Sequence, residues 1–89
     1  MQKNISIKNK IYNINYIIND TFIHIRLFSI NQDYRRRGYS RRIFDNIQKK
    51  YNKPIELECW FTLYEYYKKL GFVKVGVDEN EYFLMTKYK

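Results

Sequence analysis

The order of apolar and polar positions along this 89-residue chain predicts six strands and two helices. Stretches rich in β-branched and alternating apolar residues predict strands over residues 5–8, 11–18, 22–30 and 55–59. Apolar residues three or four positions apart predict helices over residues 39–51 and 63–70, and Gly71 ends the second. Residues 72–77 and 81–87 are typical of a closing hairpin. We therefore expect a compact α/β domain with a mixed sheet, in the order β-β-β-α-β-α-β-β.

The strand predicted over residues 22–30 changes phase part-way along. Its first half has polar His24 and Arg26 on one face and apolar side chains on the other. The apolar residues of that face are Ile23, Ile25 and Leu27. The apolar residues that follow fall where the polar face should continue, which an extra residue in the strand would explain. We predict a β-bulge near Leu27 and Phe28.

A helix separates this bulged strand from the strand over residues 55–59. Strand–helix–strand connections of this kind are right-handed crossovers that place the two strands in parallel. We expect the bulge to splay the strand over residues 22–30 from its parallel neighbour. Such a gap would expose backbone groups that a ligand could use.

Composition narrows the possible partners. Seventeen Lys and Arg against nine Asp and Glu give a net charge of +8, which suits nucleic acid, an acidic protein surface or a polyphosphate. The single cysteine, Cys59, excludes an internal disulfide, and one Cys with one His does not support a metal site such as zinc. No apolar run reaches membrane-spanning length, and the start of the chain is too polar for a signal peptide. We expect one domain over residues 1–89, in the cytoplasm.

A basic turn lies between the bulged strand and the first helix, with the sequence Arg-Arg-Arg-Gly-Tyr-Ser over residues 35–40. The N-terminus of a helix presents unpaired backbone N–H groups and the positive end of the helix dipole. Five arginines between positions 35 and 42 add charge there. A phosphate site fits this corner, above all one for the pyrophosphate of a cofactor. A solvated basic face is the alternative.

Three features in the same order resemble the GCN5-related N-acetyltransferase (GNAT) superfamily. Arg35, Gly38 and Ser40 match the acetyl-CoA loop Q/R-x-x-G-x-G/A. Residues 66–72 match the helix ending F-Y-x-K-x-G-F except at the first position. Ile30 lies where the family usually has valine, eight residues before the glycine. The resemblance covers about residues 22–87.

The resemblance implies a site for acetyl-CoA as co-substrate. Backbone groups of the bulged strand would pair with the pantetheine arm, and N–H groups of residues 36–40 would hold the pyrophosphate. A glycine at position 38 would let the backbone approach the phosphates. The cofactor-binding residues implied are Phe28, Ser29, Ile30, Arg35, Arg36, Arg37, Gly38, Tyr39 and Ser40.

The resemblance also implies catalytic roles. Tyr67 matches the tyrosine that, in many members, protonates the departing CoA thiolate, although a merely packed tyrosine is the alternative. The base is open at this point. His24 is one candidate, since histidine exchanges protons near neutral pH, and a histidine paired with a neighbour is the alternative. Glu58 is the second candidate base, and a solvated carboxylate with no catalytic role is the alternative. Water is the third candidate base. Cys59 is better explained as a buried small residue than as an acyl carrier.

The chain departs from the family in having no sequence for two helices after the first strand. Those helices help to wall the acceptor pocket, so the acceptor side should be open unless a partner in a homodimer covers it. An open site favours an amine on a protein or another macromolecule, nucleic acid included. Very small phage-type acetyltransferases share this layout. Trp60 lies nearest the family's asparagine before the second helix, where packing beneath that helix is expected over lining the acceptor side.

These features lead to two hypotheses. The first is an acetyl-CoA-dependent N-acetyltransferase acting by direct transfer to an amine. The alternative is a non-catalytic basic binding module for nucleic acid or an acidic protein, which would use the arginines and tyrosines for backbone and stacking contacts.

Overall fold

Six strands form one mixed sheet in the spatial order β1-β2-β3-β4-β6-β5. The computed structural model describes residues 2–89. Its strands are β1 (Lys3–Lys8), β2 (Tyr12–Ile18), β3 (Ile23–Ile30), β4 (Ile55–Cys59), β5 (Val73–Val77) and β6 (Phe83–Lys87). Its helices are α1 (Tyr39–Tyr51) and α2 (Tyr64–Lys69), each preceded by a short 3₁₀ turn, η1 (Gln32–Tyr34) and η2 (Phe61–Leu63). The expected element order is confirmed, and the 3₁₀ turns are additions to it.

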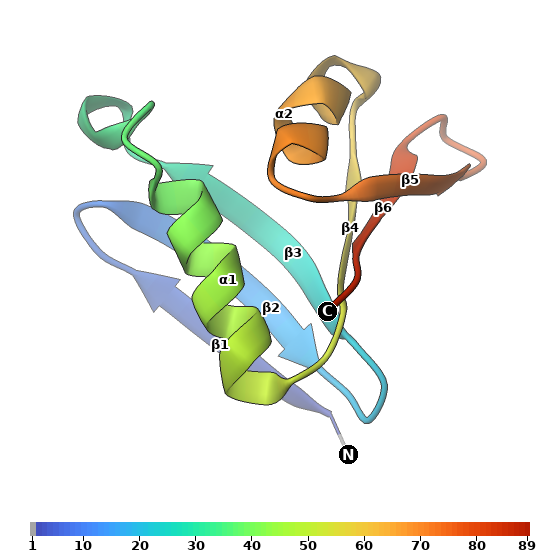
Figure 1. Ribbon diagram of the computed structural model, residues 1–89, viewed down its shortest axis with the longest axis horizontal. Helices are drawn as coiled ribbons and strands as arrows, with labels where there is room; N and C mark the ends of the chain where they lie inside the picture. Colours follow the sequence, from blue (N-terminus) through green and yellow to red (C-terminus); the bar gives the residue numbers. More distant parts are fainter. Residues whose placement is uncertain (1) are drawn as a thin grey trace.

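Helix α1 lies across β1 to β3 on one face of the sheet (Figure 1). It begins after Gly38 and ends at Asn52, and both flanking residues have left-handed backbone, with φ of 78° and 54°. The Asn52 N–H donates to the carbonyl of Gln48, which ends the helix in a tight turn. The helix buries Phe44 and Ile47 against the sheet.

The core joins both helices to one face of the sheet. Phe44 of α1 is fully buried, and its ring lies 4.7 Å from that of Phe28 on β3, centroid to centroid. The same ring lies 6.5 Å from that of Tyr67 on α2 and 5.4 Å from that of Phe72. The Phe44 side chain therefore packs α1, α2 and β3 together at one point of the core. This point lies beneath the site described below.

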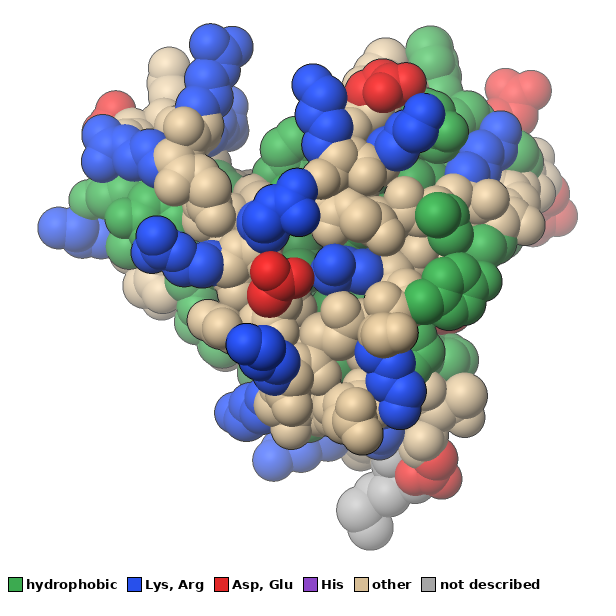
Figure 2. Space-filling model, in the orientation of Figure 1, with side chains coloured by type: hydrophobic (Ala, Val, Ile, Leu, Met, Phe, Trp, Pro, Cys, Tyr) green, Lys and Arg blue, Asp and Glu red, His purple; other side chains and the backbone are tan. Residues whose placement is uncertain are grey.

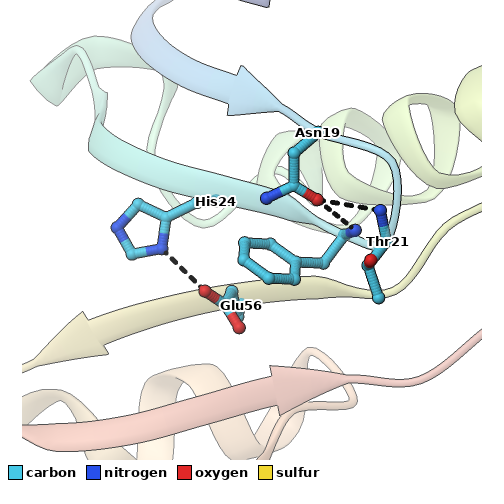
Figure 3. Close-up of polar contacts among 5 residues, drawn as sticks. Asn19, Thr21, His24 and Glu56 are labelled. Atoms are coloured by element: carbon cyan, nitrogen blue, oxygen red, sulfur yellow. Dashed lines mark hydrogen bonds and ion pairs between the residues drawn. The ribbon is translucent and has the colours of Figure 1, made fainter. Parts of the chain in front are cut away.

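Strands β3 and β4 are parallel but pair only at one end. Residues 23–25 pair with residues 55–57, and the Ile23 N–H donates to the Pro54 carbonyl at 2.9 Å. The Asn19 side chain holds the start of β3, because its oxygen accepts the N–H groups of Thr21 and Phe22 (Figure 3). Beyond this end the two strands diverge toward α2 (Figure 1). The expected splay is therefore present.

The bulge lies one residue earlier than predicted. Tyr16 of β2 pairs with Ile25 and Asn15 pairs with Leu27, which leaves Arg26 as the extra residue of β3. Because the bulge precedes Leu27, this side chain does not share the face of Ile23 and Ile25, as the alternation suggested. It is 47% exposed on the opposite face.

The opposite face of the sheet bears no helix among the described residues. It bears many polar side chains beside a few apolar ones such as Leu27, because alternate residues of β2, β3, β4 and β6 point away from the core. Those residues include Asn13, Asn15, His24, Glu56, Glu58 and Thr86. We call it the open face. β1 runs directly into β2 through a short turn, so no helix arises there to cover it.

No helix in residues 2–89 has the length and apolar character needed to cross a membrane.

Candidate active site

A cavity of about 630 Å³ occupies the gap between β3, the basic turn and α2. The molecule is visibly notched between this turn and α2 (Figure 2). The cavity is lined by Phe28, Ser29, Ile30, Tyr34, Arg35, Arg36, Gly38, Tyr39, Ser40, Arg41, Leu63, Tyr66, Tyr67, Lys69 and Leu70. Every residue assigned to cofactor binding from the sequence lines it except Arg37. The splay of β3 from β4 thus opens a space suited to an extended ligand.

The basic turn presents unpaired N–H groups to this cavity. Arg36 and Gly38 both have left-handed backbone, with φ of 63° and 78°. Of residues 36–41, none has a backbone N–H that donates to a backbone carbonyl in the part of the chain that the structure describes. Successive N–H groups in such a turn, at the start of a helix, form an anion-binding concavity.

Gly38 is required here by backbone conformation. A φ of 78° is unfavourable for residues that carry a Cβ atom. A Cβ added at this position would meet nothing within 4 Å, so packing within the protein does not select glycine.

The arginines of the turn have different tasks. The Nε atom of Arg35 donates to the Ile30 carbonyl at 3.0 Å, so its side chain fixes the turn to the end of β3. Arg37 lies outside the cavity, and its guanidinium is 5.5 Å from the centroid of the Tyr34 ring. Arg36 remains as a cavity-lining arginine with no ion pair to another described residue. Its charge is available to an anion.

Two contacts across the cavity were not foreseen. The Ser40 hydroxyl and the Tyr66 hydroxyl form a hydrogen bond, and the Arg41 guanidinium donates to the Lys69 carbonyl. Both join the start of α1 to α2, elements that are far apart in the sequence. Tyr66 could have been noticed because it is the first residue of the helix-ending motif. Arg41 had no local signal beyond its charge.

Tyr67 of α2 lines the cavity. It is buried, and its ring packs against those of Tyr66 and Phe72, with centroids 5.1 and 5.5 Å away. Burial is the main cause that raises the pKa of the Tyr67 phenol above its ordinary value, with smaller contributions from Tyr66 and Cys59. The phenol therefore keeps its proton throughout the physiological pH range and can only donate it.

Cys59 ends β4 beside this tyrosine, and Trp60 follows it. Cys59 is buried, as expected, and burial raises the pKa of its thiol, which opposes a role as nucleophile. The expectation that Trp60 packs beneath the second helix is wrong. Trp60 is 53% exposed, and its ring contacts that of Tyr82, 4.4 Å away, which gives it a partner in the β5–β6 turn instead.

The other two proposed catalytic residues lie on the open face. His24 of β3 is opposite Glu56 of β4, and its Nδ1 atom is 3.1 Å from the Glu56 carboxylate (Figure 3). Glu58 lies two residues further along β4, beyond the last pair with β3. Glu56 was not among the predicted catalytic residues, although its alternation with Leu57 placed it on the same face as Glu58.

The pKa of the Glu58 carboxyl is raised, and the Asp78 carboxyl is the largest cause, followed by burial. The pKa of Asp78 is lowered, and the Glu58 carboxyl is the largest cause. Asp78 lies between β5 and β6, and nothing in the sequence linked it to β4.

Comparison with known proteins identifies the family. The family model of the acetyltransferase (GNAT) domain matches residues 6–89. The chain belongs to the GNAT acetyltransferases. A search of curated protein sequences finds no match. Membership makes acetyl transfer the general activity of this fold, with acetyl-CoA as the family's usual donor.

Solved structures of similar fold include small proteins. The anti-CRISPR protein AcrVA5 is 20% identical, with a TM-score of 0.73 over 93% of this chain and 96% of its own. An acetyltransferase from Bacillus cereus is 19% identical, with a TM-score of 0.75 over 100% of this chain and 74% of its own. A protein assigned to the GNAT family from Bacteroides thetaiotaomicron is 21% identical, with a TM-score of 0.74 over 99% of this chain and 62% of its own. At these identities the likeness shows the fold.

The GNAT donor fits the residues present. The unpaired N–H groups of residues 36–41 and the Arg36 side chain suit a pyrophosphate. The edge of β3 beyond residue 25, released by the splay, offers backbone groups to an extended amide chain. Tyr67 lines the cavity from α2, opposite the end of β3, so it could contact the thioester end of the same ligand.

Proposed function

We propose that this GNAT chain is an acetyl-CoA-dependent N-acetyltransferase that moves an acetyl group directly to an amine carried by a protein or another macromolecule. One observation supports the proposal: two titratable side chains lie on opposite faces of the sheet near the splayed end of β4. Tyr67 approaches from the face that holds the cavity, and Glu58 lies on the open face. A donor and an acceptor could therefore meet in the gap from opposite sides.

Acetyl-CoA, when bound, supplies the acetyl group as a thioester. The basic turn would hold its pyrophosphate, and the released edge of β3 would orient its arm. Both are fixed before binding, since Arg35 ties the turn to β3 and Phe44 packs beneath Phe28. Rigid placement of this kind removes much of the entropic cost of bringing two reactants together.

The acceptor amine must lose a proton before its lone pair can attack. Glu58 would take that proton: an N–H bond of the ammonium breaks, and an O–H bond forms on the carboxyl. The nitrogen would then form a C–N bond with the acetyl carbon as the C–S bond breaks. Tyr67 would give its phenolic proton to the leaving sulfur, whose thiol has an ordinary pKa of about 8.5, and would take back the second proton that the nitrogen loses on becoming an amide. His24 lies further from the gap, in the part of β3 that pairs with β4. From there it would favour the anionic form of Glu58.

The open face supports a large acceptor. No helix among the described residues covers it, so small amines would find no enclosing pocket there. Exposed Leu27 and Trp60 lie beside the gap and could contact a protein surface. The carboxylates of Glu56 and Glu58 favour a cationic amine such as a lysine side chain or an N-terminus.

An assay of peptide acetylation tests this assignment. A lysine-containing peptide serves as the acceptor, and the release of CoA is measured. We expect Glu58→Gln to lower kcat/KM by about 10²-fold or more, the usual contribution of a positioned base, and His24→Gln to lower it less. Glu65→Gln is a matched control, because this exposed carboxylate on α2 does not line the cavity. Wild-type rates in Glu58→Gln would exclude Glu58 as the base. A larger loss in His24→Gln would give the role to the histidine.

A further inference from the structure

The helix that carries Tyr67 is short. Helix α2 has only six residues, and a helix of this length is not stable in water without contacts to the rest of a protein. On its buried side, the ring of Tyr67 packs against those of Phe44 and Phe72. Apolar packing is non-directional, so it fixes the depth of the helix better than its rotation about its own axis.

Two polar contacts reach α2 from consecutive residues at the start of α1. The hydroxyls of Ser40 and Tyr66 form a hydrogen bond, and the Arg41 guanidinium donates to the Lys69 carbonyl. The carbonyls of the two residues before Lys69 accept N–H groups of the turn that follows, so Arg41 supplies a partner for the next carbonyl of the helix end. All four residues line the cavity, and the two contacts therefore join its opposite walls.

The hydroxyl pair lies at two positions where this chain differs from the GNAT motifs. The motifs have glycine or alanine at the position of Ser40, and phenylalanine at that of Tyr66. None of these motif side chains has a hydroxyl, so a chain with the motif residues cannot form this hydrogen bond. Tyr66 is 41% exposed, and its hydroxyl is the only group that distinguishes it from phenylalanine. The hydrogen bond is thus a feature of this sequence and not a requirement of the fold.

We propose that Tyr66 is a positioning residue for the transfer reaction: its hydrogen bond to Ser40 fixes the rotation of α2 and so holds the Tyr67 hydroxyl at the leaving sulfur. The inference rests on the proposed function. Tyr66 and Tyr67 are adjacent, with ring centroids 5.1 Å apart, so a restraint on one side chain is passed to the other. Ser40 belongs to the turn that would hold the pyrophosphate, so this bond also sets the spacing between the two ends of the donor site. Proton transfer requires hydrogen-bond reach, which makes it more sensitive to a small displacement than binding is.

Removal of the Tyr66 hydroxyl tests this role. We expect Tyr66→Phe to lower kcat about three- to tenfold, the range that one neutral hydrogen bond contributes. The affinity for acetyl-CoA, measured by calorimetry, should stay close to that of the wild type because the ring remains. Tyr64→Phe is the matched control, since it makes the same change on the same helix outside the cavity and should leave kcat unchanged. An unchanged kcat in Tyr66→Phe, or a loss of affinity at wild-type kcat, would overturn the inference.

A double-mutant cycle tests whether Tyr66 acts through Ser40. Ser40→Ala should lower both kcat and the affinity for acetyl-CoA, because Ser40 also lines the proposed donor site. In the Ser40→Ala background, Tyr66→Phe should cause no further fall in kcat, since the hydrogen bond is already gone. If Tyr66→Phe lowers kcat by the same factor in both backgrounds, Tyr66 does not act through Ser40 and the inference is wrong.

Amide hydrogen exchange tests the attachment of α2 without the reaction. We expect residues 64–70 to exchange faster in Tyr66→Phe than in the wild type or Tyr64→Phe, when each protein is measured by mass spectrometry without a donor. Equal exchange rates in all three proteins would overturn the inference. Faster exchange in Tyr66→Phe, combined with no amine acetylation by the wild type, would instead overturn the proposed function and support the attachment alone.

Discussion

At the scale of single residues, the site depends on where protons are held. Burial raises the pKa of the Tyr67 phenol, and the Asp78 carboxyl is the largest cause that raises the pKa of Glu58. The two groups lie on opposite faces of the sheet because side chains alternate along β4, where Cys59 faces Tyr67 and Glu58 faces away. The proposed proton donor and the proposed proton acceptor are thereby kept apart by one layer of backbone.

The role of Tyr67 can be isolated by removing its hydroxyl. We expect Tyr67→Phe to lower kcat by about 10²-fold, because the leaving sulfur loses its hydrogen-bond donor. The affinity for acetyl-CoA, measured by calorimetry, should stay close to that of the wild type, since the ring and its contacts with Phe72 remain. Tyr64→Phe makes the same chemical change on the same helix, outside the cavity, and should leave kcat unchanged. A wild-type kcat in Tyr67→Phe would remove Tyr67 from the mechanism.

At the scale of elements, one extra residue in β3 creates the site. The bulge at Arg26 lies just after the last residue that pairs with β4, and the two strands separate from there. The starts of β3 and β4 are held together by the hydrogen bond from the Ile23 N–H to the Pro54 carbonyl. The Asn19 side chain also holds the start of β3. A pair of strands closed at one end and bulged at the other opens as a wedge, and the cavity occupies that wedge.

Deletion of Arg26 tests this origin of the cavity. A regular β2–β3 ladder should straighten β3 and extend its pairing with β4, which would remove the exposed edge. We expect the affinity for acetyl-CoA to fall at least about tenfold, a loss of about 1.4 kcal/mol. Arg26→Ala keeps the extra residue and loses only the side chain, so it should bind nearly as well as the wild type. Equal affinities in the deletion variant and the wild type would show that the bulge does not hold the site open.

Local signals predicted the elements well. Helix α1 and strand β4 have the predicted bounds, since the Tyr39–Tyr51 periodicity and the Pro54 stop are contained within each segment. The bulge was placed one residue late, because Leu27 is apolar and continues the alternation although it lies after the extra residue. The place of the β5–β6 hairpin beside β4 could not be predicted. It depends on the pairing of β6 with β4, a non-local pairing that no short pattern encodes.

At the scale of the whole molecule, charge and exposure are divided between two faces. Lys and Arg side chains are spread over the face that carries α1, in keeping with the net charge of +8 (Figure 2). That charge should speed the approach of a polyanionic donor. The open face instead brings carboxylates to the gap, where a cationic amine must arrive. The two substrates of the proposed reaction are thus matched to different sides of the sheet.

The most direct test of the account is calorimetric titration of the purified protein with acetyl-CoA. We predict saturable one-to-one binding, weakened about tenfold or more in Arg36→Glu, because this variant places a negative charge where the pyrophosphate would lie. Lys3→Glu makes the same change of charge at the exposed start of β1 and should bind like the wild type. The absence of binding at millimolar acetyl-CoA would contradict the proposed function. It would favour instead a non-catalytic basic module for nucleic acid or an acidic protein.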